Sequence, residues 1–146
     1  MSTPGAVKIL DKRINGALYL WTRYDGQVEG PHGLGQFLKG FLPCIVDYWG
    51  DSIDAGAIAN DLMGLSREKR EGEELEVFLP ENEDRWCWGD YNYLITIETK
   101  KFKRFEYLTI KLETDVEDED DEDRYHRVVL FQWEEGDDED CEVEII

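Results

Sequence analysis

The stretch YNYLITIETKKFKRFEYLTIKL, from Tyr91 to Leu112, decides the fold of this chain. Apolar and polar residues alternate along Tyr91–Glu98 and again along Phe105–Leu112, which is the period of a β-strand with one buried face. The connection Thr99–Arg104 is short and basic, and it predicts a hairpin between the two strands. We therefore expect an antiparallel pair of strands at this point of the sequence.

More strands are predicted on both sides of this hairpin. Ala6–Leu10 and Ala17–Tyr24 are rich in apolar and aromatic residues, and Asn15-Gly16 between them is a favoured hairpin turn. Alternation and β-branched or aromatic content predict three further strands, at Leu75–Leu79, His126–Trp133 and Cys141–Ile146. Because most strands follow one another without an intervening helix, the sheet should be mainly antiparallel.

Two amphipathic helices are predicted after the second strand. In the first, apolar residues recur at helical spacing from Leu34 to Leu42, and Pro43 is expected to end the helix. The second helix begins at Asp51 or Ser52, since either side chain caps a helix N-terminus. Its buried stripe consists of Ala55, Ile58, Ala59, Leu62 and Leu65.

The size and composition of the chain suit one folded unit. It has 146 residues, of which 41% are hydrophobic and 12% aromatic, enough for one core. We expect a single α+β domain over residues 1–146, with a mainly antiparallel sheet of six or seven strands and two helices packed on one face. No apolar run approaches the ~18 residues that cross a bilayer, and the N-terminus lacks a secretory signal pattern. We therefore expect a cytoplasmic protein, inside the host cell if it is viral.

Net charge is the strongest functional signal in the sequence. The chain carries 35 acidic and 16 basic residues, a net charge of −19, and 17 of the acids lie from Glu113 to Glu144 beside only two arginines. Such a chain is repelled by nucleic acid and by anionic membranes, and it attracts basic surfaces. We therefore expect no direct binding to nucleic acid or membranes, and a partner with a basic surface.

Two acidic runs, Asp115–Asp123 and Glu134–Asp140, dominate the C-terminal third, residues 113–146, and are expected to form long exposed loops between strands. If the strands hold the carboxylates in fixed positions, the rows imitate the phosphates of DNA and steer association with a basic partner. The predicted partner-binding residues are Asp115, Glu117, Asp118, Glu119, Asp120, Asp121, Glu122, Asp123, Glu134, Glu135, Asp137, Asp138, Glu139 and Asp140.

Catalytic, metal and cofactor chemistry have little support in the sequence. The three cysteines, Cys44, Cys87 and Cys141, are far apart, and neither histidine lies near a second soft ligand, so no zinc spacing is present. No nucleophile motif or nucleotide-binding fingerprint occurs. We expect no catalytic residue, no metal and no cofactor, with a metal-assisted enzyme as the third hypothesis for the function.

A small-ligand site, for a nucleotide, is the second hypothesis. The loop DGQVEGPHGLG, Asp25–Gly35, precedes a helix N-terminus, where amides bind phosphate, although a structural turn with a helix entry is the favoured interpretation of its glycines. Two tryptophans beside an arginine, further along the chain, either stack on a base or start a buried strand. The candidate ligand-binding residues are Tyr24, Asp25, His32, Arg85, Trp86 and Trp88.

One basic group stands out against the acidic background. It lies in the connection of the predicted hairpin and consists of Lys100, Lys101, Lys103 and Arg104. An anion could dock there, but a solvated hairpin tip is the simpler interpretation.

The segment Tyr19–Leu42 resembles a family of small uncharacterised proteins from bacteriophages, large DNA viruses and some microbial genomes. Their shared segment is a strand, an Asp-Gly-Tyr-Pro turn, a Gly-His-Gly-like turn and an amphipathic helix. The residues that match in kind are Tyr24, Asp25, Gly26, Gly30, His32 and Gly33, whereas Gln27 and Val28 replace Tyr-Pro. A second similarity lies at Gly89-Asp90-Tyr91-Asn92-Tyr93. The resemblance implies a viral or mobile-element setting and no mechanism.

The functional hypothesis from the sequence is a non-enzymatic acidic interaction protein. It would act as a viral accessory or anti-defence inhibitor, and as a DNA mimic it would bind the basic surface of a host nucleic-acid-binding protein. The predicted edge strand Cys141–Ile146 also makes a homodimer by strand addition a candidate assembly.

Overall fold

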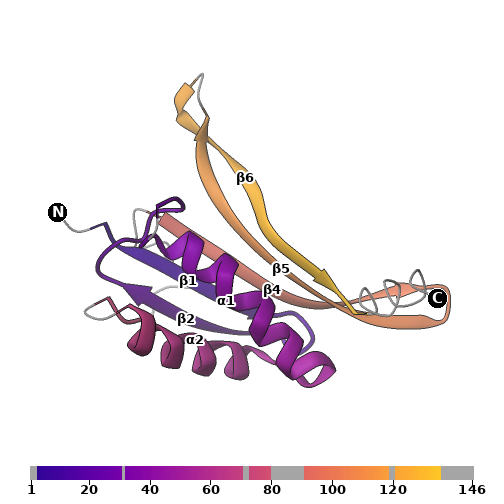
Figure 1. Ribbon diagram of the computed structural model, residues 1–146. Coiled ribbons are helices and arrows are strands. Elements are labelled where there is room, and N and C mark those ends of the chain that lie inside the picture. Colours follow the sequence, from indigo (N-terminus) through magenta and orange to yellow (C-terminus); the bar gives the residue numbers. More distant parts are fainter. Residues whose placement is uncertain (1–2, 31, 71–72, 80–90, 119–120, 136–146) are drawn as a thin grey trace, which may run out of the picture.

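The computed structural model describes residues 3–30, 32–70, 73–79, 91–118 and 121–135. Within them the chain forms six strands, two α-helices and one short 3-10 helix (Figure 1). In chain order these are β1 (Gly5–Asp11), β2 (Gly16–Thr22), α1 (Leu34–Trp49), η1 (Gly50–Ser52), α2 (Ala55–Lys69), β3 (Glu76–Val77), β4 (Tyr91–Phe102), β5 (Phe105–Asp118) and β6 (Asp121–Glu134).

The six strands form one mixed sheet in the order β3-β2-β1-β4-β5-β6. Each neighbouring pair is antiparallel except β1 and β4, which run parallel with Gly5 beside Tyr91 and Asp11 beside Ile97. The expected hairpin is present, and β4 and β5 pair as far as Phe102 and Phe105. The prediction of an α+β fold with a mainly antiparallel sheet is confirmed.

One face of the sheet carries the hydrophobic core. Val7 and Ile9 of β1 lie beside Tyr93 and Ile95 of β4, and all four side chains are fully buried. Helices α1 and α2 lie next to each other over this face (Figure 1) and pack their apolar residues into the same core. Their fully buried members are Leu34, Leu38, Leu42, Val46, Ile58 and Leu62.

Helix α1 continues through Pro43 to Trp49, so the expected end at Pro43 is wrong. Proline cannot donate a backbone hydrogen bond to the carbonyl of Lys39, and its ring crowds the preceding turn. The buried stripe nevertheless continues with Ile45 and Val46, and the burial of these side chains offsets that cost.

Helix α2 begins later than the sequence predicts. Asp54 caps it, because its carboxylate accepts a hydrogen bond from the Ala57 amide at 2.7 Å, and η1 occupies the two residues that were expected to cap it, Asp51 and Ser52. The expected strand at Leu75–Leu79 is reduced to the two residues of β3, which pair with Leu20 and Trp21 of β2.

The described residues of the first acidic run, 115–118 and 121–123, are strand rather than the expected long loop. β5 extends to Asp118 and β6 begins at Asp121, and the ladder includes Val116 beside His126 and Glu117 beside Tyr125. The sequence misled here because acidic residues have low strand propensity, yet a two-stranded ribbon can carry charged side chains on either face. The expected strand Cys141–Ile146 lies outside the described residues.

Candidate functional site

The far half of the β5–β6 hairpin stands clear of the helices (Figure 1). We call this part the acidic arm and define it as Glu113–Asp118 of β5 with Asp121–Val129 of β6. It holds seven carboxylates and two arginines, and its backbone is paired from Glu113 beside Val129 to Asp118 beside Asp121, with one register shift between Glu117 and Asp118. Strand pairing therefore holds the backbone of Asp115, Glu117 and Asp118.

The charge density of the acidic arm is in the range of a nucleic acid. At ~3.4 Å per residue, its β5 segment spans about 17 Å. Seven carboxylates and two arginines leave five net negative charges over that length, about one per 3.4 Å, which equals the axial spacing of charges along one strand of B-DNA. One of the arginines is engaged, since Arg127 Nε donates to Asp115 Oδ1 at 3.1 Å.

The two acidic runs lie at opposite ends of β6. Glu134 pairs with Thr109 at the end of β6, and the amide of Glu135 donates to the Leu108 carbonyl at 2.9 Å, far from the tip of the acidic arm. The predicted partner-binding residues that lie outside the described residues are Glu119, Asp120, Asp137, Asp138, Glu139 and Asp140. Of the described acids, only those of the first run are brought together on the acidic arm.

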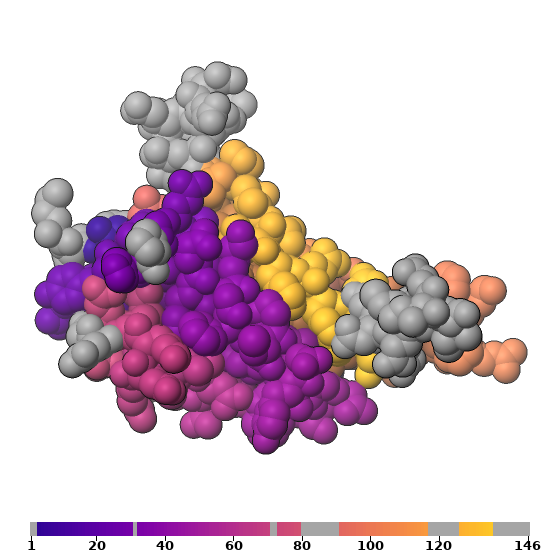
Figure 2. Space-filling view, viewed as in Figure 1, coloured from indigo at the N-terminus to yellow at the C-terminus, as the bar shows by residue number. Residues whose placement is uncertain are grey.

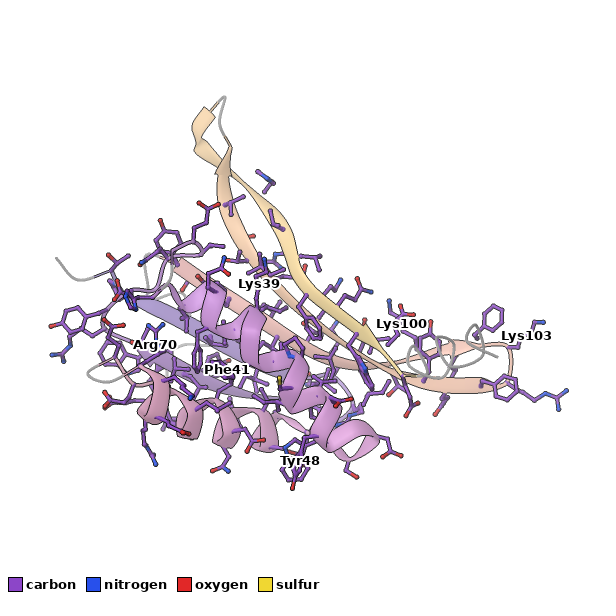
Figure 3. All side chains as sticks on the ribbon, in the orientation of Figure 1. Lys39, Phe41, Tyr48, Arg70, Lys100 and Lys103 are labelled. Atoms are coloured by element: carbon purple, nitrogen blue, oxygen red, sulfur yellow. The ribbon has the colours of Figure 1, made fainter. Side chains whose placement is uncertain are left out.

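A second candidate site is a cleft of about 480 Å³ beside the N-terminal half of α1. Its walls are His32, Gly33, Gln36, Phe37, Phe41, Lys69, Arg70 and Glu73. Figure 3 shows Arg70 and Phe41 on the helix-covered side of the sheet. The cleft therefore combines an apolar wall from α1 with charged groups from the end of α2.

Arg70 is the organising side chain of this cleft, and only 5% of it is exposed. Its guanidinium donates to the backbone carbonyls of His32 at 2.8 Å, Tyr24 at 3.2 Å and Asp25 at 3.4 Å. It also donates to the carbonyl of Glu73 at 3.2 Å. Burial lowers the pKa of Arg70, and the carboxylates of Glu73 and Asp25 oppose that shift. Arg70 thus fastens the Gly-rich loop to the C-terminal end of α2.

Asp25 and Glu73 form a hydrogen-bonded carboxyl pair next to this guanidinium. The hydrogen bond from Glu73 lowers the pKa of Asp25, and the same contact raises the pKa of Glu73 above its usual value. Glu73 Oε2 lies 3.6 Å from Arg70 Nη2. Two carboxyl groups in contact shift each other's pKa values in opposite directions, because ionising both brings like charges together.

Three backbone amides of the Gly-rich loop, Asp25–Gly35, donate their hydrogen bonds to carbonyls within the same loop. The amides of Gly33, Leu34 and Gly35 donate to the carbonyls of Gly30, Asp25 and Gln27 at 3.1, 2.7 and 3.1 Å. A Cβ on Gly33 would lie 2.5 Å from the Glu29 carbonyl oxygen, so close backbone approach explains this glycine. A ligand in the cleft would therefore be held by side chains and not by these three amides.

The structure brings together three of the six predicted ligand-binding residues. Tyr24, Asp25 and His32 are neighbours because Arg70 binds the carbonyl of each. The other three, Arg85, Trp86 and Trp88, lie outside the described residues. Sequence reasoning missed Arg70 and Glu73 as parts of this site, since a basic residue in the last turn of a helix suits the helix dipole anyway.

Tyr93 is a further residue that the sequence analysis placed only as a strand residue. Its hydroxyl donates to the Gly26 carbonyl at 2.6 Å, and burial raises the pKa of this hydroxyl. The Gly-rich loop is thereby held from two directions, by α2 through Arg70 and by the sheet through Tyr93.

No group of three or more metal-ligating side chains is found in the part of the chain that the structure describes. In the same residues, no helix is both long and apolar enough to cross a membrane. Comparisons of the chain with family models, with curated proteins and with solved structures gave no match. The functional argument therefore rests on the geometry of the acidic arm and of the cleft.

Proposed function

We propose that this protein is a non-enzymatic interaction protein, and that its acidic arm docks on the basic surface of a nucleic-acid-binding protein. The observation that carries the proposal is the β5–β6 ladder, which gives the acidic run a fixed backbone. Fixed charges lose less entropy on binding than charges on a mobile loop, and they steer a basic partner during encounter.

The shape of the acidic arm supports DNA mimicry as the particular mode of binding. A narrow ribbon that stands clear of the helices can enter a groove built for a nucleic-acid strand, and its net charge spacing matches one strand of a duplex. The partner would then be blocked from its nucleic acid. In the setting that the sequence resemblance implies, the protein would serve as a viral accessory or anti-defence inhibitor within the host cell.

The test is displacement of a labelled duplex from a panel of purified nucleic-acid-binding proteins, followed by fluorescence anisotropy. Neutralising three acids of the acidic arm, with Asp115→Asn, Glu117→Gln and Asp118→Asn, should weaken displacement at least tenfold. The matched control neutralises three acids on the helices and η1 and loses the same net charge, with Asp47→Asn, Asp51→Asn and Glu68→Gln, and should displace DNA almost as well as wild type.

Two results would contradict this proposal. One is equal loss in the two triple variants, which would mean that total charge rather than the acidic arm attracts the partner. The other is binding that survives unchanged in about 0.5 M salt, where the Debye length falls to roughly 4 Å and exposed charges are screened.

The cleft supports a second candidate function, the binding of a small ligand such as a nucleotide. The specific observation is that Phe37 and Phe41 form an apolar wall opposite His32, Lys69 and Glu73 in one cavity. Thermal-shift screening with nucleotides and cyclic dinucleotides tests it, with Phe41→Ala as the matched variant. A stabilisation that Phe41→Ala removes would support the site, and no shift from any nucleotide would exclude this function.

A further inference from the structure

The hairpin end of β4 and β5 is a second exposed surface with the opposite charge. We call Thr99–Glu106 the basic tip; it carries three lysines and one arginine against one glutamate, and all eight residues are exposed. Figures 2 and 3 show it standing away from the helices, with Lys100 and Lys103 on it.

Two phenylalanines make the basic tip more than a solvated turn. Phe102 and Phe105 face each other across the hairpin in register, yet 64% and 67% of their surfaces are exposed. Lys103 Nζ lies 5.5 Å from the centre of the Phe102 ring, a cation–π contact that keeps charge and ring together. Exposed aromatic side chains beside cations are typical of the centres of interaction surfaces.

The basic tip and the acidic arm lie at the two ends of one strand. β5 starts at Phe105 in the basic tip and ends at Asp118 in the acidic arm. From Glu106 in the basic tip to Glu113, where the acidic arm begins, seven residue steps of ~3.4 Å separate the two surfaces by about 24 Å, about three times the Debye length of ~8 Å at physiological salt. One molecule therefore cannot neutralise its own basic tip with its own acidic arm.

Within the chain, Lys101 of the basic tip pairs with Glu106 at 3.3 Å, and a second copy of the chain offers the basic tip further partners. The acidic arm carries five net negative charges against the four cations of the basic tip, and Val129, 47% exposed on β6 beside Glu113, is an apolar contact for the phenylalanines. The two ends of the molecule are thus complementary in charge and in apolar surface. Acids of the two copies that lie farther apart than the Debye length repel each other only weakly, because salt screens them.

We propose that copies of this protein associate head to tail, with the basic tip of one copy bound to the acidic arm of the next. The two surfaces differ, so the contact is heterologous, and it builds open chains unless a ring closes. Self-association would then compete with partner binding, because both use the acidic arm. The proposal shares that surface with the proposed function, but it needs no partner protein to be tested.

Sedimentation velocity of the full chain gives the first test. In about 0.15 M salt the mean mass should rise beyond that of a dimer as concentration increases, and in about 0.6 M salt it should return to the monomer mass of 17.1 kDa. A wild-type protein that stays monomeric at every concentration up to the millimolar range would overturn the proposal.

Mixing two variants gives the decisive test. The tip variant combines Lys100→Gln, Phe102→Ser, Lys103→Gln and Phe105→Ser. The arm variant combines Glu117→Gln, Asp118→Asn, Asp121→Asn and Glu122→Gln. Each variant alone should be monomeric, and their equimolar mixture should stop at two copies, because one intact tip meets one intact arm. Either variant associating alone as strongly as wild type would refute a tip-to-arm contact, and circular dichroism checks that both are folded.

The same variants separate this proposal from its alternatives and from the proposed function. If the basic tip instead serves lipid or nucleic acid, wild type will bind anionic vesicles or single-stranded DNA while remaining monomeric, and that result overturns the head-to-tail contact. The tip variant should displace duplex DNA from a partner at least as well as wild type. Loss of displacement with intact self-association would instead refute the proposed function alone.

Discussion

Arg70 is a buried cation, and its side chain donates hydrogen bonds mainly to backbone carbonyls and not to the neighbouring carboxylate of Glu73. Four carbonyls accept from it, three of them in a loop that is 38 to 46 residues away in the sequence. Because a lysine has no planar fork of donors, its ammonium cannot replace this set of contacts. The residue therefore acts as a cross-link between α2 and the loop before α1.

Replacing this cross-link should cost substantial stability. We expect Arg70→Met to lower the free energy of unfolding by about 3 kcal/mol or more, because buried carbonyls lose charged donors. Lys69→Met on the same turn of α2 is the matched control, and since Lys69 is exposed it should change the value by no more than about 0.5 kcal/mol. Urea unfolding measures both, and equal small effects would show that Arg70 is not a cross-link.

The Asp25–Glu73 pair predicts a pH dependence. The pKa of Glu73 is raised in the folded state above its ordinary value of 4.5. Its contribution to the free energy of unfolding is therefore fully present below pH 4.5 and is lost as the pH rises through the folded-state pKa. Asp25 has a lowered pKa, so its contribution is present above 3.8 and is lost as pH falls through the lowered pKa. The pair is therefore most stabilising between the two folded-state pKa values.

Glu73→Gln should remove the loss of stability that accompanies ionisation of Glu73 as the pH rises, since the amide keeps a hydrogen-bond donor without ionising. The difference in unfolding free energy between variant and wild type should shift in favour of the variant as pH rises from about 4.5 to about 6.5. Glu68→Gln, exposed on α2, removes the same charge and serves as control. A constant difference across that range would mean that the contact with Asp25 does not raise the pKa of Glu73.

At the scale of elements, hydrophobic periodicity in the sequence predicted the strands and helices that bury one face in the core. Alternation from Tyr91 to Leu112 placed β4 and β5, and the stripe from Leu34 placed α1, because both follow from side chains that face one core. The parallel pairing of β1 with β4 depends on chain topology, which no local pattern contains. The acidic strands were missed because their stability comes from cross-strand pairing, as with Asp115 and Arg127.

The acidic arm could be predicted from the sequence better than the cleft, because the cleft depends on contacts between distant segments of the chain. The acidic arm follows from composition, since 17 of the 35 acids lie from Glu113 to Glu144. The cleft does not, because Arg70 and Glu73 reach it only through the packing of α2 against the Gly-rich loop. Tyr24, Asp25 and His32 were found through the loop motif, without the residues that hold them in place.

Pro43 makes α1 a testable case of core burial overriding backbone preference. We expect Pro43→Ala to raise the free energy of unfolding by about 1–3 kcal/mol, because it restores a backbone donor and removes the ring clash. Gly40→Ala in the same helix, where an added Cβ meets nothing within 4 Å, should raise it by about 0.5–1 kcal/mol. Thermal and urea unfolding compare them, and a destabilised Pro43→Ala would show that the proline ring itself is needed for packing.

At the scale of the whole molecule, a net charge of −19 acts against compactness. The melting temperature should therefore rise by several degrees between about 0.02 M and about 0.3 M potassium chloride, as salt screens repulsion among carboxylates. The triple neutralised variants of the acidic arm and of the helices should each show a smaller rise. A melting temperature that falls with added salt would mean that ion pairs, such as Lys12 with Glu98, outweigh repulsion.

The parallel contact between β1 and β4 has a consequence for the newly made chain. Gly5 meets Tyr91 only after more than eighty further residues have been synthesised, so the contact order of the centre of the sheet is high. Until then, the growing polypeptide exposes one open edge of β1, whose backbone donors and acceptors on that side lack their partner strand, and nascent chains in that state are prone to aggregate. Slow translation before residue 97 should therefore lower the yield of native protein, whereas slow translation after it should not.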